Sequence, residues 1–113
     1  MSGPPPRVKA QLWVSIALRM GDIAGKPGAV LRKGDADAGG ILVVLHGRDG
    51  LCVLSRMTDP DGGHAWIRAT GPDPVPQETA DAYVARQLRF DPDLWVLEFE
   101  AHDMIPPFDA KIL

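Results

Sequence analysis

The sequence predicts an α+β domain in which a mainly antiparallel sheet of about five or six strands carries one main helix, residues 77–90, packed on one face. Three observations predict this class. The 12 glycines and 11 prolines cluster and leave uninterrupted segments between them. Most of these segments are short and apolar or alternating, as strands are, whereas one has an apolar stripe at helical spacing. Hydrophobic residues make up 45% of the 113 residues, which is enough for the core of one domain.

The distribution of prolines and patterned segments also sets the expected domain limits. Residues 1–7 contain three consecutive prolines and predict a disordered leader. Residues 8–101 hold the patterned segments and form the single globular domain. Residues 102–113 are expected to be a C-terminal tail.

The element at residues 12–20 is ambiguous between a helix and a strand. The apolar residues at helical spacing are Val8, Leu12, Ile16 and Met20. Those that alternate as in a strand are Leu12, Val14, Ile16 and Leu18. The β-branched side chains of Val14 and Ile16 favour the strand, which we expect to continue into a short helical turn near residues 21–25.

A β-hairpin follows. Residues 41–45 are apolar throughout, which predicts a central strand buried on both faces. The Asp-Gly dipeptide at residues 49–50 reverses the chain, and the apolar residues 51–54 return as the second strand. A second turn at residues 59–63 leads to a third antiparallel strand at residues 64–68.

The main helix is predicted by its ends and by its apolar face. Pro76 suits the first helical position, and Glu78 lies in the first turn, where the helix dipole favours an acidic residue. Its apolar stripe contains Ala80, Tyr83, Val84, Gln87 and Leu88. Asp91 precedes a proline, which ends the helix. The last strand, residues 94–100, alternates between apolar residues and glutamates, so we expect one of its faces to be wet.

Charge and composition restrict the compartment and the partners. Fifteen acidic and twelve basic residues give a net charge of −3, so nucleic acid and anionic membranes are not expected partners. No apolar run approaches the roughly 20 residues that span a bilayer, and no segment suits a signal peptide. With a single cysteine, Cys52, no internal disulfide can form. We therefore expect a cytoplasmic protein.

The motifs for catalysis, cofactors and metals are missing from the sequence. In an EF-hand counted from Asp35, position 5 would be Gly39 and position 12 His46, and neither supplies the required carboxylate. Cys52 lies in an apolar strand, where a buried thiol is expected. His46 and His64 flank the hairpin but have too few further ligands for zinc. We thus predict no catalytic, cofactor-binding or metal-ligating residue and no cofactor.

Four residues form a candidate binding face. Alternation places Arg56 on one face of the second hairpin strand and both Trp66 and Arg68 on one face of the third. Arg19, from the first element, is expected nearby. Arginines beside an aromatic ring could bind an anion, an acidic peptide or a single-stranded nucleic acid. The competing interpretation is that the tryptophan covers the core and the arginines are solvated or paired with aspartates.

These features favour a non-enzymatic binding or protein-interaction domain, with an unidentified protein partner or a second copy of the chain. One alternative is a metal-assisted or carboxylate-assisted enzyme that uses two acidic loops, Asp35/Asp37 and Asp91/Asp93. The other is a single-stranded nucleic-acid binder that uses the candidate binding face. The sequence favours a protein that is not an enzyme, and it does not identify what the protein does.

Three segments also carry a resemblance to a known family. They are residues 12–14 (LWV), 31–39 (LRKGDADAG) and 89–96 (RFDPDLWV). Together they resemble a family of small bacterial proteins catalogued as a domain of unknown function, number 1491, and the resemblance covers residues 8–101. It implies an uncharacterised protein and carries no activity, cofactor or catalytic residue onto this chain.

Overall fold

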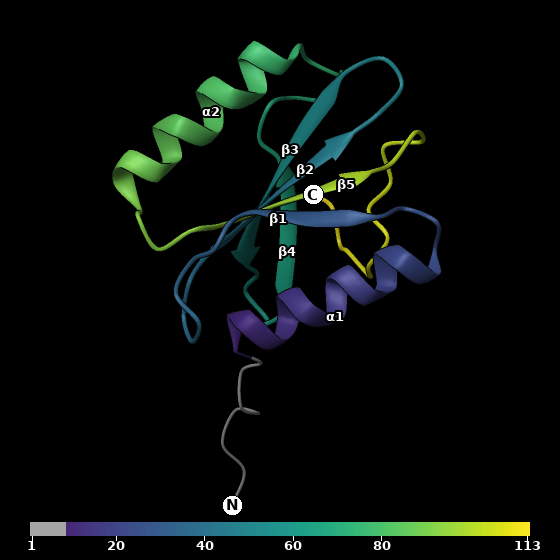
Figure 1. Ribbon diagram of the computed structural model, residues 1–113. Coiled ribbons are helices and arrows are strands. Elements are labelled where there is room, and N and C mark those ends of the chain that lie inside the picture. The colour runs from purple at the N-terminus through teal and green to yellow at the C-terminus, as the bar shows by residue number, and fades with distance from the viewer. Residues whose placement is uncertain (1–8) are drawn as a thin grey trace, which may run out of the picture.

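Two helices lie on opposite faces of a five-stranded sheet in the computed structural model, which describes residues 9–113 (Figure 1). The predicted leader, residues 1–7, lies outside the described residues. In chain order the elements are α1 (Ala10–Ile23), β1 (Gly28–Arg32), β2 (Ile41–His46), β3 (Leu51–Thr58), β4 (His64–Arg68), α2 (Gln77–Phe90) and β5 (Trp95–Glu100). The α+β class is therefore confirmed, but with two helices rather than one main helix.

The sheet is mixed, which corrects the expectation of a mainly antiparallel sheet. Its strand order is β1-β5-β2-β3-β4. β5 enters between β1 and β2, antiparallel to β1 and parallel to β2, with Val43 opposite Leu97 in the parallel pair. Parallel neighbours require a long crossover. Here β3, β4 and α2 together make that connection from β2 to β5.

The strand expected at residues 12–20 is wrong, because this segment belongs to α1. The residues that α1 buries against the sheet are Ala10, Val14, Ala17 and Gly21. They recur at helical spacing and are mostly small, so they gave a weak apolar signal. Leu12 and Ile16, which made the strand pattern convincing, lie on the exposed side of the helix.

The hairpin, the third strand and the second helix follow the predictions closely. β2 and β3 are the expected hairpin strands, and β4 has the expected bounds. In α2, Ala80 is buried and the rest of the predicted stripe is partly buried. The sheet residues below it are Leu42, Val44, Leu51, Val53 and Val96. The alternation of β5 is confirmed too, although Val96 is buried on the face that carries the glutamates.

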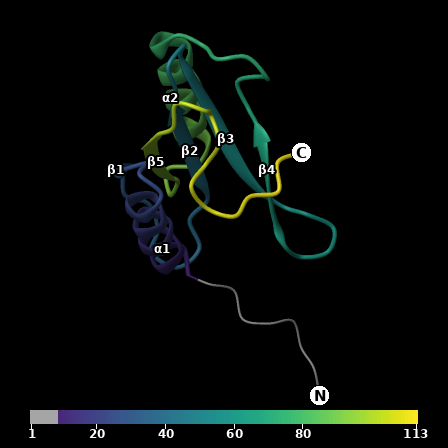
Figure 2. The same cartoon turned by 90° about the vertical axis from the view of Figure 1, so that its right-hand side faces the viewer.

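The C-terminal segment, residues 102–113, lies on the same sheet face as α1, where Figure 2 shows it in yellow, crossing the sheet. Phe108 is 7% exposed and sits among three aromatic rings, with ring-centroid distances of 5.0 Å to Trp13, 5.2 Å to Trp66 and 5.9 Å to Phe99. Ile112 then forms a parallel bridge with Trp66. The segment that the sequence sets apart as a tail thus covers part of the core. No helix in residues 9–113 has the length and apolar character to cross a membrane.

Candidate binding site

Three of the four residues of the candidate binding face do share one face of the sheet. Arg56 and Trp66 are direct partners in the antiparallel pair of β3 and β4, and Arg68 is opposite Leu54 two residues further along. This face is, however, the one that α1 and the C-terminal segment cover. Trp66 is 2% exposed, so its ring offers no surface on which a nucleic-acid base could stack.

Arg19 does not join this group, because it lies on the exposed side of α1. Arg68 is partly buried, and its Nη1 atom lies 3.9 Å from the Sγ atom of Cys52. Cys52 is buried, as its apolar strand predicts. Arg68 therefore shares the sheet face of Arg56, Arg19 does not, and of these three arginines Arg56 is the one that lines the cavity described next.

Arg56 is positioned by an aromatic ring from α1. Its guanidinium carbon lies 5.4 Å from the centroid of the Trp13 ring, within the range of a cation–π contact. Trp13 in turn lies 5.5 Å from Trp66, centroid to centroid. The Arg56 guanidinium therefore lies beside the aromatic cluster, in contact with the ring of Trp13.

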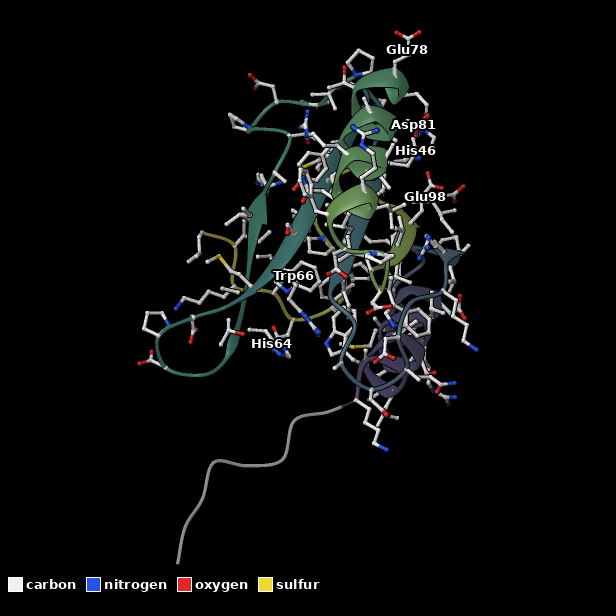
Figure 3. The ribbon with its side chains drawn as sticks, turned by 90° about the vertical axis from the view of Figure 1, so that its left-hand side faces the viewer. His46, His64, Trp66, Glu78, Asp81 and Glu98 are labelled. Carbon is white, nitrogen blue, oxygen red and sulfur yellow. The ribbon has the colours of Figure 1, made fainter. Side chains whose placement is uncertain are left out.

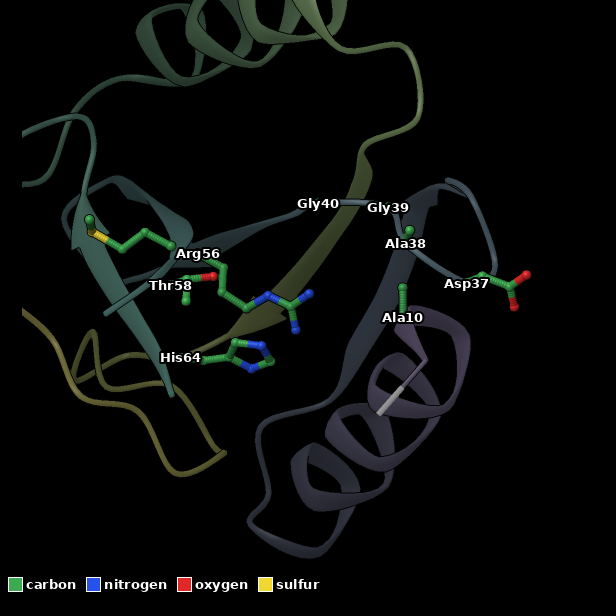
Figure 4. A pocket seen from close by; sticks show the side chains of 9 residues that line it. Ala10, Asp37, Ala38, Gly39, Gly40, Arg56, Thr58 and His64 are labelled. Atoms are coloured by element: carbon green, nitrogen blue, oxygen red, sulfur yellow. The ribbon is translucent and has the colours of Figure 1, made fainter. Parts of the chain in front are cut away.

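Arg56 lines a cavity of about 220 Å³ between the β3–β4 hairpin and the loop that precedes β2. Figure 4 shows Arg56 and His64 pointing from the hairpin toward Gly39 and Gly40. Thr58, which is directly opposite His64 in the ladder, lines the same cavity. One guanidinium, one imidazole and one hydroxyl thus come together from two adjacent strands.

The wall of the cavity opposite the hairpin is formed by residues 37–40, in the loop that precedes β2. Hydrogen bonds anchor this loop on two sides. The backbone N–H of Asp35 donates to the carbonyl of Asp93 at 3.0 Å, and the indole Nε1 of Trp95 donates to the carbonyl of Asp35 at 2.7 Å. At the start of α1, the N–H of Gln11 donates to the carbonyl of Ala36 at 2.9 Å. The loop therefore has a fixed place between α1 and β5.

The four aspartates of the two acidic loops mostly serve the loops themselves. Asp35 accepts the N–H groups of residues 37 and 38 at 3.2 and 2.8 Å, and Asp91 accepts the N–H of Asp93 at 3.1 Å. Asp37, which also lines the cavity, pairs with Lys9 at 3.5 Å. The loops lie side by side through the hydrogen bond from Asp35 N–H to the Asp93 carbonyl, while the carboxylates of Asp35 and Asp91 cap turns of their own loops.

No metal site is evident in the described part of the chain. Within residues 9–113, no three histidine, cysteine, aspartate or glutamate side chains are placed to hold an ion. In Figure 3, His46 lies beside Glu98 at the far end of the sheet from His64. His46 Nδ1 is 3.2 Å from Glu98 Oε1. The two histidines that flank the hairpin therefore do not combine into one site.

The sequence contained a usable signal for most of this cavity. Arg56 and Thr58 are two residues apart, so they had to share a face of the strand, and the turn at residues 59–63 brings His64 back beside them. What the sequence did not reveal was the opposite wall. Gly39 and Gly40 are distant in the chain, and the helix that fixes their loop was expected to be a strand.

Together, the fold and the cavity define a small three-layered α+β domain, helix–sheet–helix, with a surface pocket lined by Arg56 and His64 on the side of the mixed sheet that α1 covers. The chain belongs to the family described as proteins of unknown function, DUF1491, whose model matches residues 8–109. The match extends through Phe108, which agrees with the place of that residue in the core.

Solved structures agree with this assignment. The crystal structure of a DUF1491 family protein from Caulobacter crescentus is 31% identical with a TM-score of 0.83, and the comparison covers 95% of this chain and 100% of that one. An NMR structure of a DUF1491 protein from the same organism is 31% identical with a TM-score of 0.82, covering 96% and 99%. The solution structure of Atu0922 from A. tumefaciens is 26% identical with a TM-score of 0.80, covering 96% and 98%. No match was found among the curated proteins.

Proposed function

We propose that this chain is a non-enzymatic binding domain that receives a carboxylate or phosphate group in the cavity beside Arg56. The observation that carries the proposal is the convergence of Arg56 and His64 on one cavity whose opposite wall is the Gly39-Gly40 loop. A guanidinium can bind both oxygens of such a group at once, and the contact with the Trp13 ring supports the Arg56 side chain beside the cavity.

The size of the cavity suits part of a ligand. Sites for whole small molecules usually measure roughly 300 to 1,000 Å³, whereas this cavity measures about 220 Å³. It would therefore hold the anionic group while the rest of the ligand lies outside. The imidazole of His64 and the hydroxyl of Thr58 are placed to add hydrogen bonds to that group.

The other two hypotheses from the sequence find less support. A carboxylate-assisted or metal-assisted enzyme would need free carboxylates, whereas Asp35 and Asp91 already accept N–H groups of their own loops. A single-stranded nucleic-acid binder would need an exposed ring, whereas Trp66 is buried. We therefore favour binding over catalysis, and an anionic group over a nucleic-acid strand. The cytoplasmic location inferred from the sequence remains part of this proposal.

The test is a titration with inorganic phosphate and, separately, with acetate, followed by amide chemical shifts. We expect shifts centred on Gly39, Gly40 and His64, and the Arg56→Gln variant should bind at least about tenfold more weakly, because it loses a charged hydrogen bond worth roughly 1.5–3 kcal/mol. Arg48→Gln, in the exposed turn between β2 and β3, is the matched control and should bind like the wild type.

Arg56→Gln also removes the stack on Trp13, so its fold must be checked by the dispersion of the spectrum. The Thr58→Val variant provides a second test, because it removes one hydroxyl and leaves the stack in place. The proposal is wrong if neither anion shifts these amides at about 10 mM, a concentration that would reveal even a binding free energy near −3 kcal/mol.

A further inference from the structure

The two faces of the sheet differ in how completely they are covered. On one face, α1 and the C-terminal segment lie together over the core. On the other face, α2 packs on buried residues of β2, β3 and β5. In the part of the chain that the structure describes, β1 contributes no residue to this second core, although it lies directly beside β5. The α2 layer therefore stops short of this edge of the sheet.

A groove of about 300 Å³ lies in the space that remains between α2 and β1. The apolar residues that line it are Leu31 of β1, Val44 of β2, Val96 of β5, and Val84 and Leu88 of α2. Sites that hold whole small molecules usually measure roughly 300 to 1,000 Å³ and are mostly apolar. The groove is at the lower end of this range, so it suits a small ligand with an apolar body.

An irregularity in β1 brings two adjacent residues to this groove. The register with β5 shifts between Val30, which is opposite Leu97, and Arg32, which is opposite Val96. Adjacent residues of a regular strand point to opposite faces of the sheet. Here Leu31 and Arg32 both line the groove. Such bulges are common beside functional sites, where they redirect a side chain.

The rim of the groove carries more negative than positive charge. Asp81 of α2 and Glu98 of β5 both line it, and Figure 3 shows the two side chains on the same side of the molecule. Arg32 supplies one positive charge, but its Nη1 atom donates to the carbonyls of Pro92 and Leu94 at 2.8 and 3.4 Å. Two carboxylates thus oppose one guanidinium that already has backbone partners. This rim favours a cationic ligand over an anionic one.

Both carboxylates are held in place by a neighbouring side chain. Gln77 Nε2 donates to Asp81 Oδ1 at 2.8 Å, and His46 Nδ1 lies 3.2 Å from Glu98 Oε1. These contacts use one oxygen of each carboxylate. The other oxygen can accept a further hydrogen bond, and an ammonium group is a donor in all three of its N–H bonds.

We propose that this groove binds a small organic cation, a primary ammonium group on a short apolar chain. The apolar chain lies against Leu31 and Val84, and the ammonium group donates to the carboxylate of Asp81 or Glu98. The groove is on the face of the sheet that α2 covers, whereas the cavity beside Arg56 is on the α1 side. The proposal is therefore independent of the proposed anion site.

The experiment titrates the full chain with hexylammonium, hexanoate and 1-hexanol, three probes that share one apolar chain and differ in charge. Hexylammonium should shift the amide signals of Leu31, Val84 and Val96. Hexanoate should bind at least about tenfold more weakly, with 1-hexanol between the two. The proposal fails if about 10 mM hexylammonium leaves these amides unchanged, if hexanoate binds as tightly, or if the shifts centre on His64 instead.

A double variant tests the two carboxylates. Asp81→Asn/Glu98→Gln removes both charges and keeps the size of both side chains, so the affinity for hexylammonium should fall by about tenfold or more while that for 1-hexanol stays the same. Asp22→Asn/Asp109→Asn changes the net charge equally at two exposed positions and should bind like the wild type. Equal losses in the two double variants would overturn the assignment.

A second pair of variants tests the apolar wall. Leu31 is 56% exposed, and Leu12 on α1 is 54% exposed, so neither is needed for the core. Leu31→Ser should weaken hexylammonium and 1-hexanol by a similar factor, about threefold or more, because both lose the same apolar contact. Leu12→Ser is the matched control and should bind both probes like the wild type. A Leu31→Ser variant that binds both probes unchanged would rule out this wall.

Discussion

At the residue scale, small side chains decide how closely α1 approaches the sheet. Gly21 lies in the last turn of the helix, where a Cβ atom would come within 2.6 Å of the Lys26 carbonyl oxygen and 2.8 Å of Phe99 Cε1. Both distances are far below van der Waals contact. The glycine thus permits the helix to pack directly on the ring of Phe99.

The Gly21→Ala variant tests this packing, because the added methyl group has two opposite effects on the free energy of unfolding: higher helix propensity raises it, and overpacking against Phe99 lowers it. Propensity alone would stabilise the helix by about 1 kcal/mol. Overpacking typically costs about 1–3 kcal/mol, and we expect it to dominate, so that the free energy of unfolding falls. Ser15→Ala, on the exposed side of the same helix, is the control and should be neutral or slightly stabilising in urea denaturation. A more stable Gly21→Ala variant would contradict the close contact.

The sequence predicted the residues of the candidate site correctly where strand alternation alone determines which face of the sheet a side chain occupies. Arg56 and Trp66 share a face because they are cross-strand partners in one hairpin, and alternation is a property of the local backbone. Arg19 was placed near them on the assumption that its segment is a strand. Side chains alternate every two residues in a strand but repeat every 3.6 residues in a helix, and on α1 the side chain of Arg19 is exposed to solvent.

At the element scale, the C-terminal segment acts as part of the core. It has no helix and no named strand, yet it brings Phe108 into the space between α1 and the sheet. Its local pattern could not reveal this role, because residues 102–113 contain two prolines and no regular periodicity. Only the contacts with Trp13 and Trp66 identify it as a covering layer.

Phe108→Ala should therefore lower the free energy of unfolding by about 3–5 kcal/mol, the usual cost of removing a buried phenylalanine. Phe90→Ala is the matched control, because Phe90 is 80% exposed at the end of α2 and its removal should change stability by less than about 0.5 kcal/mol. Chemical denaturation of both variants measures the difference. Equal effects would show that the segment is not packed as described.

At the scale of the whole molecule, two ion pairs fasten the C-terminal segment at its ends. Near its start, Lys26 Nζ lies 2.9 Å from an oxygen of Asp103 and donates to the carbonyl of Ile105. The hydrogen bond from Lys26, followed by that from the N–H of Ile105, holds the pKa of Asp103 below its ordinary value of 3.8. This pair joins the segment to the turn between α1 and β1.

The second ion pair fastens the other end of the segment. Lys111 Nζ lies 3.5 Å from Asp59 Oδ2, in the turn between β3 and β4. Burial by itself would raise the pKa of Asp59, but the N–H groups of Gly63 and Asp61 together with Lys111 outweigh it, so the pKa lies below 3.8. Both carboxylates are therefore more acidic in the folded chain than in the unfolded one.

Acid should consequently weaken the attachment of the segment. A carboxylate whose pKa is lower in the folded state contributes stability above its unfolded pKa, near 3.8, and loses it as the pH falls through the folded value. The double variant Asp59→Asn/Asp103→Asn should be less stable than the wild type at neutral pH.

The difference between the double variant and the wild type should disappear in acid well below pH 3.8, where the wild-type carboxylates are protonated as well. Urea unfolding at neutral and at acid pH measures it. Asp61→Asn/Asp73→Asn, two exposed aspartates outside these ion pairs, is the control and should follow the wild type. A difference that persists in acid would contradict the assignment to ionised carboxylates.

The sequence by itself determined the elements whose signals are local. The hairpin of residues 41–54, the strand at 64–68 and the helix at 77–90 follow from apolar periodicity and from the turn residues that separate them, and both act within a few residues. Only the tertiary structure decided that residues 10–23 are a helix, that β5 pairs in parallel with β2 and that the C-terminal segment covers Trp66. Each of these depends on contacts between residues far apart in the chain, which no local pattern records.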